Sequence, residues 1–561
     1  MLDWYKREEK IKWWEFFELL ASTEEELFEH RKSISYVQYL NKREPFKKSF
    51  LDFYTFPKQE ADFKVGATVF SGEEGYSIGT VHDISHHEQT VVIKKANKNL
   101  DIHPNAFINR EDIPNKDKIE AIVALGAYVA EHGINHEGGK FKIARKLLQK
   151  QIQIEEENLL QQHGDFIEKS FQWAMGLDNG ILAIQGPPGT GKSFTCSHMV
   201  LKLIAEGKKI GISAMSHAVI ENLLQKIHDE AQLAGIPIKM IQKVPADFNR
   251  EADWTTLQKD DDIFSALGDA NVLAGTVFMW SKPIYDQTVD YLIIDEAGQL
   301  SLIDTLAVSN AGQNLILLGD PQQLQQPIQG THPDGTEVSA LDHLLDGKQT
   351  IDNDKGIFLE KTWRMHPNIC AFISEMFYED KLQPVAGLEN QTIKNRSLIN
   401  GSGLRYRKVQ HEGNVNSSLE EIEEIKKIVT DLCQDGSVYV NKEGLEKQIT
   451  LKDIKIISPY NAQVQALKAA FPGIEIGTVD KFQGQEAPIV IYSVATSTPE
   501  DAPRGMEFLY SPNRFNVAVS RAKALFVLVA NGKIFEPECK SPAQIKLANP
   551  FCRYLEVAEE V

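Results

Sequence analysis

The stretch ILAIQGPPGTGKSFT, residues 181–195, joins an apolar run to a glycine-rich loop and then to a helix-compatible segment. Its loop fits the pattern G-x-x-x-x-G-K-[ST], in which glycines let backbone N–H groups surround phosphates at a helix N-terminus. We expect Lys192 to reach the β- and γ-phosphates and the Ser193 hydroxyl to bind Mg²⁺. The residues expected around the phosphates are Gly186, Pro187, Pro188, Gly189, Thr190, Gly191, Lys192 and Ser193.

A phosphate-binding loop needs a second metal-binding carboxylate and a group that activates water. The segment YLIIDEAGQL, residues 291–300, supplies an apolar run that ends in Asp295 and Glu296. We expect Asp295 to hold Mg²⁺ and Glu296 to polarise the attacking water, although a lone strand end of this kind is commonly just solvated. In LILLGDPQQLQQP, residues 315–327, Gln323 could hydrogen-bond a γ-phosphate or could be an ordinary turn residue.

Transfer of a phosphoryl group also needs positive charge at the transition state, and arginine is the usual source. Arg364 lies in LEKTWRMHP, residues 359–367, after a short apolar run. Arg521 lies in NRFNVAVSRAKALFVLVA, residues 513–530, between an expected helix and a buried strand. Each could instead be an ordinary surface arginine.

Seven motifs follow one another between Gly186 and Lys523: GPPGTGKS, DEAGQ, GDPQQL, WRMHP, ISPYNAQ, TVDKFQGQEAPIVI and NVAVSRAK. This ordered set resembles the superfamily 1B helicases of the nonsense-mediated-decay and replication nuclease-helicase type. The resemblance implies an α/β fold with two tandem RecA-like P-loop domains. It also implies that ATP and Mg²⁺ bind between the domains and that the motor moves 5′ to 3′ along a single strand.

The resemblance assigns roles to several of these side chains. Arg364 and Arg521 resemble the family's two arginine fingers, which reach across the cleft when it closes around ATP. Trp363 stands where the family usually has tyrosine, and its ring is expected to stack on adenine. Gln172 is the candidate for the upstream glutamine that reads the adenine edge. The remaining residues of the implied ATP site are Gly484 and Glu486.

Contacts to nucleic acid are also implied by the resemblance. Small hydroxyls and backbone amides would hold phosphates, which suits a chain without a basic surplus. The residues concerned are Ser216, His217, Thr276, Pro459, Tyr460 and Thr478. Ser216 and Thr276 could equally be helix caps or turn residues, and His217 replaces the commoner asparagine.

Composition restricts the class of protein. A chain of 561 residues is too long for one core, and 42% hydrophobic with 25% charged residues is typical of a globular protein. No apolar run approaches the roughly 18 residues of a membrane span, and the charged N-terminus does not read as a signal peptide. We therefore expect a cytoplasmic protein with no membrane partner. The net charge of −19 requires any nucleic-acid binding to come from a local groove.

The five cysteines are far apart and form no C-x-x-C pair. This spacing argues against a zinc site, an iron–sulfur cluster or a disulfide framework. They are interpreted as ordinary core thiols.

Patterns outside the motor motifs indicate the domain organisation. Short β-like runs occur in FKVGATVF, YSIGTVHDI and QTVVIKK, which suggests a small barrel. The expected parts are a helical aromatic-rich segment at 1–60, a small β-barrel at 61–110, stalk helices at 111–170, RecA-like motor domain 1 at 171–390 and RecA-like motor domain 2 at 391–561.

Within the second motor domain, Ser418 and Glu421 form a capping-box pattern that opens a helix. The residues expected on one face of that helix are Leu419, Ile422, Ile425, Ile428 and Leu432. KIISPY and IVIYSVAT are continuous apolar runs, as buried parallel strands should be.

The N-terminal segment carries Trp4, Trp13 and Trp14. It resembles the segment that joins nuclease to helicase in bacterial proteins with a RecB-like nuclease, yet no spaced Asp with E-x-K and Q-x-x-x-Y is found. One interpretation is that this helix packs on the chain's own barrel or stalk. The sharper hypothesis is that part of it docks a separate nuclease subunit, which favours DNA over RNA as the bound strand.

Three alternatives to a DNA helicase stay open at this stage. The first is an ATP-gated nucleic-acid clamp that remodels complexes without separating strands. The second is an RNA helicase. The third, a P-loop ATPase unconnected to nucleic acid such as a transporter subunit, lacks an LSGGQ-like signature in this sequence.

Overall fold

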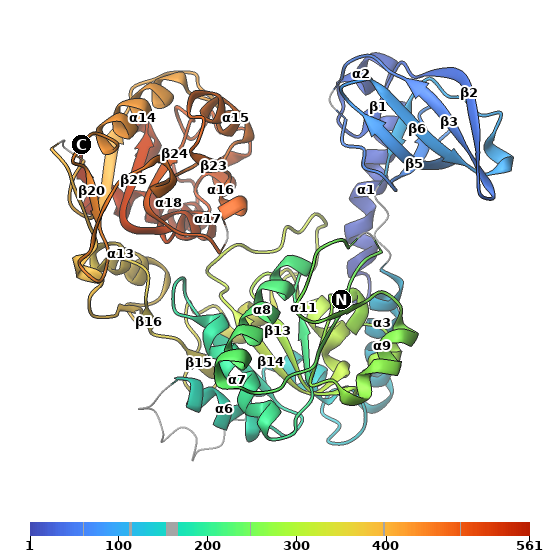
Figure 1. Cartoon of the computed structure of the whole chain (residues 1–561), viewed down its shortest axis with the longest axis horizontal. Helices are drawn as coiled ribbons and strands as arrows, with labels where there is room; N and C mark the ends of the chain where they lie inside the picture. The colour runs from blue at the N-terminus through green and yellow to red at the C-terminus, as the bar shows by residue number, and fades with distance from the viewer. Residues whose placement is uncertain (60, 111–114, 153–165, 247, 397–398, 483) are drawn as a thin grey trace. The chain divides into compact units, whose positions relative to one another are not determined.

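The computed structural model describes the chain except residues 60, 111–114, 153–165, 247, 397–398 and 483. The chain divides into two compact units, one of residues 1–120 with 327–334 and one of residues 121–326 with 335–561. The strands of the first unit are drawn in blue in Figure 1. None of the helices in the described part of the chain combines the length and apolar character needed to cross a bilayer.

The first unit is an antiparallel sheet with two helices. Its strands follow the order β1-β7-β4-β5-β6-β3-β2. The elements are α1 (Trp4–Ala21), α2 (Glu24–Glu29), β1 (Ser33–Ile34), β2 (Gln38–Phe46), β3 (Ser49–Thr55), β4 (Thr68–Ser71), β5 (Ser77–Ser85), β6 (Thr90–Lys95) and β7 (Phe107–Asn109). Tyr54, Ile93 and Phe107 are fully buried in the core of this sheet.

Residues 33–55 form strands, so the expectation of a helical segment throughout residues 1–60 is wrong for this part. The physical reason lies in β3, where Asp52 and Tyr54 are buried while Phe53 between them is only partly covered. Such alternation has the period of a strand. Lys47, with a positive φ of 55°, lies in the short connection between β2 and β3.

The second unit contains two parallel sheets. The eight strands of the first follow the order β11-β10-β12-β9-β13-β14-β8-β15. They are β8 (Ile181–Gln185), β9 (Ile210–Ser213), β10 (Met240–Lys243), β11 (Thr255–Leu257), β12 (Val272–Ala274), β13 (Val289–Asp295), β14 (Gly312–Gly319) and β15 (Gly356–Phe358). The helices of this region are α3 (Lys116–His132), α4 (Lys142–Leu148), α6 (Phe166–Met175), α7 (Lys192–Ala205), α8 (His217–Ala234), α9 (Asp260–Ala266), α10 (Val277–Trp280), α11 (Leu302–Val308) and α12 (Ala340–Leu345).

The second parallel sheet follows the order β23-β22-β24-β25-β19-β26. Its strands are β19 (Gly403–Lys408), β22 (Ile454–Ile457), β23 (Glu475–Gly477), β24 (Ala487–Ser493), β25 (Ala522–Ala530) and β26 (Glu559–Glu560). Its helices are α13 (Pro367–Phe377), α14 (Leu419–Leu432), α15 (Asn461–Ala470), α16 (Gly505–Leu509), α17 (Pro512–Val519) and α18 (Pro542–Val557). Smaller pairings involve β16 (Lys361–Thr362), β17 (Gln383–Pro384), β18 (Thr392–Lys394), β20 (Val438–Val440) and β21 (Glu446–Gln448).

The register of the first parallel sheet brings distant motifs to one edge. Gln185, at the end of β8, pairs with Gly319 of β14, and Leu318 of β14 pairs with Asp295 of β13. All three strands are parallel, so their carboxyl ends meet there, which is where ligands bind in such sheets.

Helix α13 packs against the second sheet, although it lies before residue 391, where we expected the second motor domain to begin. It contacts β19, β25 and α17. The Phe372 ring lies 6.1 Å from that of Phe515 and 5.6 Å from that of Tyr554. The domain boundaries given from the sequence remain a prediction.

Helix α14 begins as expected but its buried face differs in one position. The Ser418 hydroxyl accepts a hydrogen bond from the Glu421 backbone N–H at 3.1 Å. The predicted face is buried at Ile422, Ile425, Ile428 and Leu432. Leu419 is 72% exposed, so this part of the prediction is wrong. Each residue turns the helix by about 100°, which places Leu419 roughly 120° from the centre of the buried stripe.

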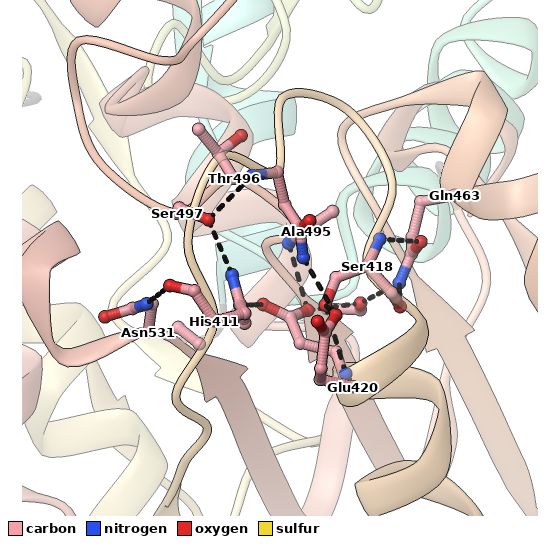
Figure 2. Close-up of polar contacts among 12 residues, drawn as sticks. His411, Ser418, Glu420, Gln463, Ala495, Thr496, Ser497 and Asn531 are labelled. Atoms are coloured by element: carbon pink, nitrogen blue, oxygen red, sulfur yellow. Dashed lines mark hydrogen bonds and ion pairs between the residues drawn. The ribbon is translucent and has the colours of Figure 1, made fainter.

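The Glu421 carboxylate does not complete the capping box but enters a buried polar network. Figure 2 labels His411, Ala495 and Ser497 among the members of this network. It accepts hydrogen bonds from the Ser493 hydroxyl at 2.6 Å and the Ala495 N–H at 2.9 Å. His411 lies between this carboxylate, at 3.2 Å, and the Ser497 hydroxyl, at 2.8 Å. Burial raises the pKa of Glu421, and the hydrogen bonds from these partners oppose that shift. The network therefore ties α14 to the segment after β24.

We predict that Glu421→Ala lowers the free energy of unfolding by about 3 kcal/mol, because it leaves His411, Ser493 and the Ala495 N–H without their buried acceptor. Leu419→Ala, on the same helix, should change it by less than about 0.5 kcal/mol because Leu419 is exposed. Equilibrium urea unfolding of the whole chain measures both. Equal stability of the two variants would contradict a stabilising role for the network.

Candidate nucleotide site

The glycine-rich loop has the backbone geometry that phosphate binding needs. Gly189 and Gly191 have positive φ values of 76° and 78°, and α7 begins directly afterwards at Lys192. The Lys192 ammonium donates a hydrogen bond to the Gly186 carbonyl at 2.6 Å. A Cβ atom on Gly186 would lie 2.2 Å from the Lys192 Cγ, so only glycine fits beside the lysine. Ser193 is exposed in the first turn of α7.

Two adjacent carboxylates lie at the end of β13. Asp295 is the last residue of the strand, and Glu296 follows in a left-handed conformation with φ of 52°. Burial and the negative charge of Glu296 raise the pKa of Asp295 to about 7. Both causes disfavour a bare anion at Asp295, so a cation beside it would be favourable. The Ser193 hydroxyl and the Asp295 carboxylate offer oxygen ligands, which Mg²⁺ prefers. Mg²⁺ commonly binds one or two protein oxygens and takes its other ligands from phosphates and water.

Gln323 is held by two neighbours. Its side-chain amide donates to the buried Asp320 carboxylate at 2.8 Å. Its amide oxygen lies 3.5 Å from an Nη of Arg521, which is a longer contact than the one to Asp320. The structure therefore brings together Gln323 and one of the two candidate arginines.

Arg521 lies between α17 and β25 and is only 2% exposed. It donates to the Gln485 carbonyl at 3.3 Å, and within the described chain its buried Nε has no hydrogen-bond partner. Burial, followed by the positive charge of Arg364, lowers the pKa of Arg521 to about 9. A buried guanidinium with an unused donor fits an anionic ligand such as a phosphate.

Arg364 follows a segment that is bound to the phosphate loop. Thr362 donates its hydroxyl to the Pro188 carbonyl at 3.1 Å, and the Trp363 N–H donates to the Gly189 carbonyl at 2.8 Å. The Arg364 side chain pairs with Glu486 at 2.6 Å and donates to the Ser520 carbonyl at 3.1 Å. Arg364 thus connects the phosphate loop with the residues just before Arg521.

Glu486 accepts from two cations, since Lys523 also lies 2.6 Å from its carboxylate. The burial of Glu486 is offset by Arg364 and Lys523, and its pKa is lowered. Gly484, two residues earlier, has a positive φ of 77°. Glu486 therefore pairs with Arg364, and Gly484 lies in the turn just before Glu486.

A cavity of about 430 Å³ adjoins the phosphate loop. Its walls come from Gly189–Gly191 of the loop, from Phe166 and Ile167 of α6, from Phe194 of α7 and from Trp363. The Trp363 ring is 59% exposed, which leaves a face for a base to stack on.

The sequence did not indicate that Phe166, Ile167 and Phe194 line a cavity. In a sequence, isolated apolar residues on a helix look like ordinary core residues. Only the position of these three beside the phosphate loop shows that they line the cavity. Gln172 lies on α6 but is not among the residues that line this cavity. Its amide donates to Glu168 at 2.7 Å.

The candidate nucleic-acid contacts of the first sheet follow β9 and β12, which are neighbours. Ser216 caps α8, accepting from the Val219 N–H at 3.3 Å, and His217 is the first residue of that helix. Thr276 takes the N-cap position of α10 without a side-chain capping bond. Ser216 therefore acts as a helix cap. The Thr276 hydroxyl does not cap its helix, although the residue lies at the N-cap position.

The candidates of the second sheet likewise follow neighbouring strands, β22 and β23. Pro459 and Tyr460 lie between β22 and α15, and Tyr460 is buried with its ring 5.6 Å from that of Phe508. Thr478 comes directly after β23 and is half-buried. Each sheet thus presents its candidates at carboxyl strand ends.

Comparisons with known proteins agree with this geometry. Residues 171–334 match one family described as an AAA domain, and residues 336–533 match a second family with that description. The chain is 26% identical over 393 residues to the DNA replication ATP-dependent helicase/nuclease DNA2 of Saccharomyces cerevisiae, covering 64% of this chain and 25% of that protein. It is 25% identical over 406 residues to the DNA polymerase alpha-associated DNA helicase A of Schizosaccharomyces pombe, covering 61% and 59%.

A third relative, the putative helicase mov-10-B.1 of Danio rerio, is 28% identical over 403 residues, covering 62% of this chain and 39% of the relative. The matched region thus spans between 25% and 59% of the lengths of these three relatives. Among solved structures, the arterivirus nonstructural protein 10 helicase in complex with DNA aligns with a TM-score of 0.40 at 13% identity, covering 87% of this chain and 80% of that one.

The fold class expected for the motor is confirmed, since two parallel sheets flanked by helices occur in tandem and the two matched regions cover nearly all of their strands. The relatives that cover this part of the chain carry helicase names. Residues 171–533 therefore form two tandem RecA-like domains that match AAA-domain families, and this part of the chain is similar to superfamily 1 helicases.

Proposed function

We propose that the protein is an ATP-driven translocase and helicase that moves 5′ to 3′ along a single strand, with DNA favoured over RNA. The observation that carries the proposal is that Lys192, Arg364 and Arg521 converge on the phosphate loop and the neighbouring loop after β14. These cations come from three separate segments, and two of them meet carboxylates or carbonyls of the second sheet's motifs. Such convergence suits a polyphosphate whose hydrolysis is coupled to movement of the two sheets.

Hydrolysis would use the groups at the end of β13 and the loop after β14. Glu296 would polarise a water whose oxygen attacks the γ-phosphorus, and the bond to the β-phosphate oxygen would break, releasing ADP and phosphate. Ser193 and Asp295 would hold Mg²⁺, whose charge offsets that of the phosphates. Arg364 and Arg521 would stabilise the charge on the transferred group, and Gln323 would respond to the γ-phosphate.

Strand movement would follow from alternate grip by the two sheets. Thr276 and Thr478, each at a carboxyl strand end of a different sheet, offer hydroxyls to backbone phosphates. Because phosphate contacts carry no base information, these residues do not separate DNA from RNA. DNA is favoured because two of the relatives described above are named DNA helicases or helicase/nucleases. We also place the protein in the cytoplasm, where its five free thiols would stay reduced.

Strand separation tests the proposal directly. Duplexes with a 5′ or a 3′ single-stranded tail, made of DNA or of RNA, are mixed with the full chain and ATP. The proposal expects separation of the 5′-tailed DNA duplex. ATPase activity that a strand stimulates without separating any duplex would favour the clamp or remodeller. Separation of the RNA duplex alone would favour an RNA helicase, and ATPase activity that no strand changes would favour an unrelated P-loop ATPase.

The exposed aromatic residues of α1 support a partner for this motor. Phe16 and Leu19 pack with Phe70 and Ile108 on the chain's own sheet, as the simpler interpretation expected. On the same helix, Trp13, Trp14 and Phe17 stay exposed. We propose that these three residues dock a separate nuclease subunit.

For the chemical step, Glu296→Gln should abolish turnover while ATP binding survives, because the amide keeps the shape but cannot polarise water as a carboxylate does. Lys192→Ala should weaken ATP binding as well, through loss of the phosphate-facing cation. Steady-state ATPase assays and binding of a fluorescent ATP analogue separate the two effects. Hydrolysis by Glu296→Gln at near the original rate would refute the assignment.

For the WRMHP segment, Trp363→Ala should raise KM for ATP several-fold, because stacking is worth on the order of 1 kcal/mol. Arg364→Ala should instead lower kcat by roughly 10³. The Trp363→Ala variant keeps the backbone hydrogen bond from residue 363 to the Gly189 carbonyl. The two variants therefore remove two neighbouring side chains separately, and each serves as the control for the other. If both variants raise KM and leave kcat unchanged, Arg364 has no role in the transition state.

For the nuclease partner, the double variant Trp13→Ala, Trp14→Ala should recover less nuclease than the wild-type chain in a pull-down from the native host, because it removes exposed apolar surface. Phe16 is left unchanged, so the packing of α1 on the sheet is kept. Circular dichroism checks that the variant is folded. Recovery of no nuclease by the wild type, or equal recovery by a folded variant, would end this proposal.

A further inference from the structure

Tyr378 lies at the end of α13 and is fully buried. Its hydroxyl donates a hydrogen bond to the Asp320 carboxylate at 2.7 Å and accepts one from the Asn516 side-chain amide at 2.9 Å. We propose that Tyr378 is a positioning residue for ATP hydrolysis, which sets Gln323 and Arg521 in register by joining Asp320 to Asn516. This inference rests on the proposed function and adds a residue that the motifs do not include.

The direction of these hydrogen bonds is fixed by chemistry. An ionised Asp320 can only accept, and the Asn516 NH₂ group can only donate. The Tyr378 hydroxyl has one hydrogen to give and lone pairs to receive, so it fits between them in one orientation. Phenylalanine at this position would leave both partners buried without this bond.

Asp320 transmits the constraint to Gln323. Its carboxylate accepts from the Gln323 amide at 2.8 Å on the same oxygen that Tyr378 contacts, and from the Gln322 N–H at 3.2 Å. Because the Gln323 NH₂ group is engaged by Asp320, its amide oxygen faces Arg521. Burial raises the pKa of Asp320, whereas Lys192 and the hydrogen bond from Tyr378 oppose that shift. The hydrogen bond from Tyr378 therefore favours the ionised form of the Asp320 carboxylate, which accepts from Gln323 and orients it.

Asn516 transmits the constraint to Arg521. It is fully buried on α17, and Arg521 follows that helix by two residues. Its amide also donates to the Gln322 carbonyl at 2.8 Å, so both of its hydrogens are used. Asn513, one turn earlier, donates to the Pro321 carbonyl at 2.8 Å. The loop after β14 is thus held by α17 through backbone carbonyls and by Tyr378 through a side chain.

The ring of Tyr378 does not require a hydroxyl for its packing. It lies 6.1 Å from the Phe358 ring of β15, a contact that phenylalanine would keep. Tyr378→Phe therefore removes only the hydrogen bonds. Tyr554→Phe is a matched control, since Tyr554 is also fully buried and donates to a backbone carbonyl, that of Arg405, at 2.7 Å.

Strand-stimulated ATPase kinetics of the full chain test the inference. Tyr378→Phe should lower kcat about ten-fold, as loss of a supporting hydrogen bond commonly does, with KM for ATP changed less than two-fold. Tyr554→Phe should keep kcat within two-fold of the wild type, even if it lowers the melting temperature as much as Tyr378→Phe does. In a Gln323→Ala background, Tyr378→Phe should cost clearly less than ten-fold more, because the part of its effect that passes through Gln323 is already lost and only the part through Asn516 and Arg521 remains.

Three outcomes would overturn the inference: an unchanged kcat for Tyr378→Phe, an equal loss for Tyr554→Phe, or a full ten-fold loss that persists in the Gln323→Ala background. The proposed function fails separately. A wild-type chain without ATPase activity would overturn both, whereas an active wild type with an unaffected Tyr378→Phe variant overturns this inference alone.

Discussion

Positive charge concentrated in a buried place is the constraint on which the motor depends. The chain carries a net charge of −19, yet Lys192 and Arg364 lie at the phosphate loop and Arg521 lies beside Gln323 of the loop after β14. Burial and the neighbouring Arg364 lower the pKa of Arg521 to about 9, which reflects the cost of keeping that charge. Glu486 compensates Arg364 but does not bond to the buried Nε of Arg521. A ligand with several negative charges would offset this cost, which is why a nucleoside triphosphate suits the site.

The parallel sheets make this concentration of charge possible. Strands β8, β14 and β13 end at the same edge, so a phosphate loop, Gln323 and a pair of carboxylates meet although they lie far apart in the sequence. Helix α17 holds the loop after β14, and Arg521 follows that helix. The distance between Gln323 and Arg521 is therefore set by the hydrogen bonds between α17 and the loop after β14, and a change at either residue reaches the other.

Much of the fold and of the nucleotide site could be predicted because their signals are local. A glycine-rich loop after an apolar strand defines its own geometry, and the stripe from Ile422 to Leu432 has helical period. Tertiary contacts decided the rest. Glu421 has the spacing of a capping box, but Ser493 and Ala495 attract its carboxylate instead. Tyr378 reads as a core aromatic residue, and only its place between Asp320 and Asn516 gives it a role.

If nucleotide phosphates join the two sheets through Arg521, bound nucleotide should fix the distance between the two motor domains. Labels at Leu233→Cys and Leu419→Cys, both on exposed positions of the two motor domains, would report the distance between them by pulsed electron spin resonance once the partly exposed native cysteines are replaced. We expect a non-hydrolysable ATP analogue with a single strand to narrow the distance distribution, and Arg521→Ala to leave it broad although the analogue still binds. An identical distribution with and without bound nucleotide in the otherwise wild-type chain would contradict this expectation.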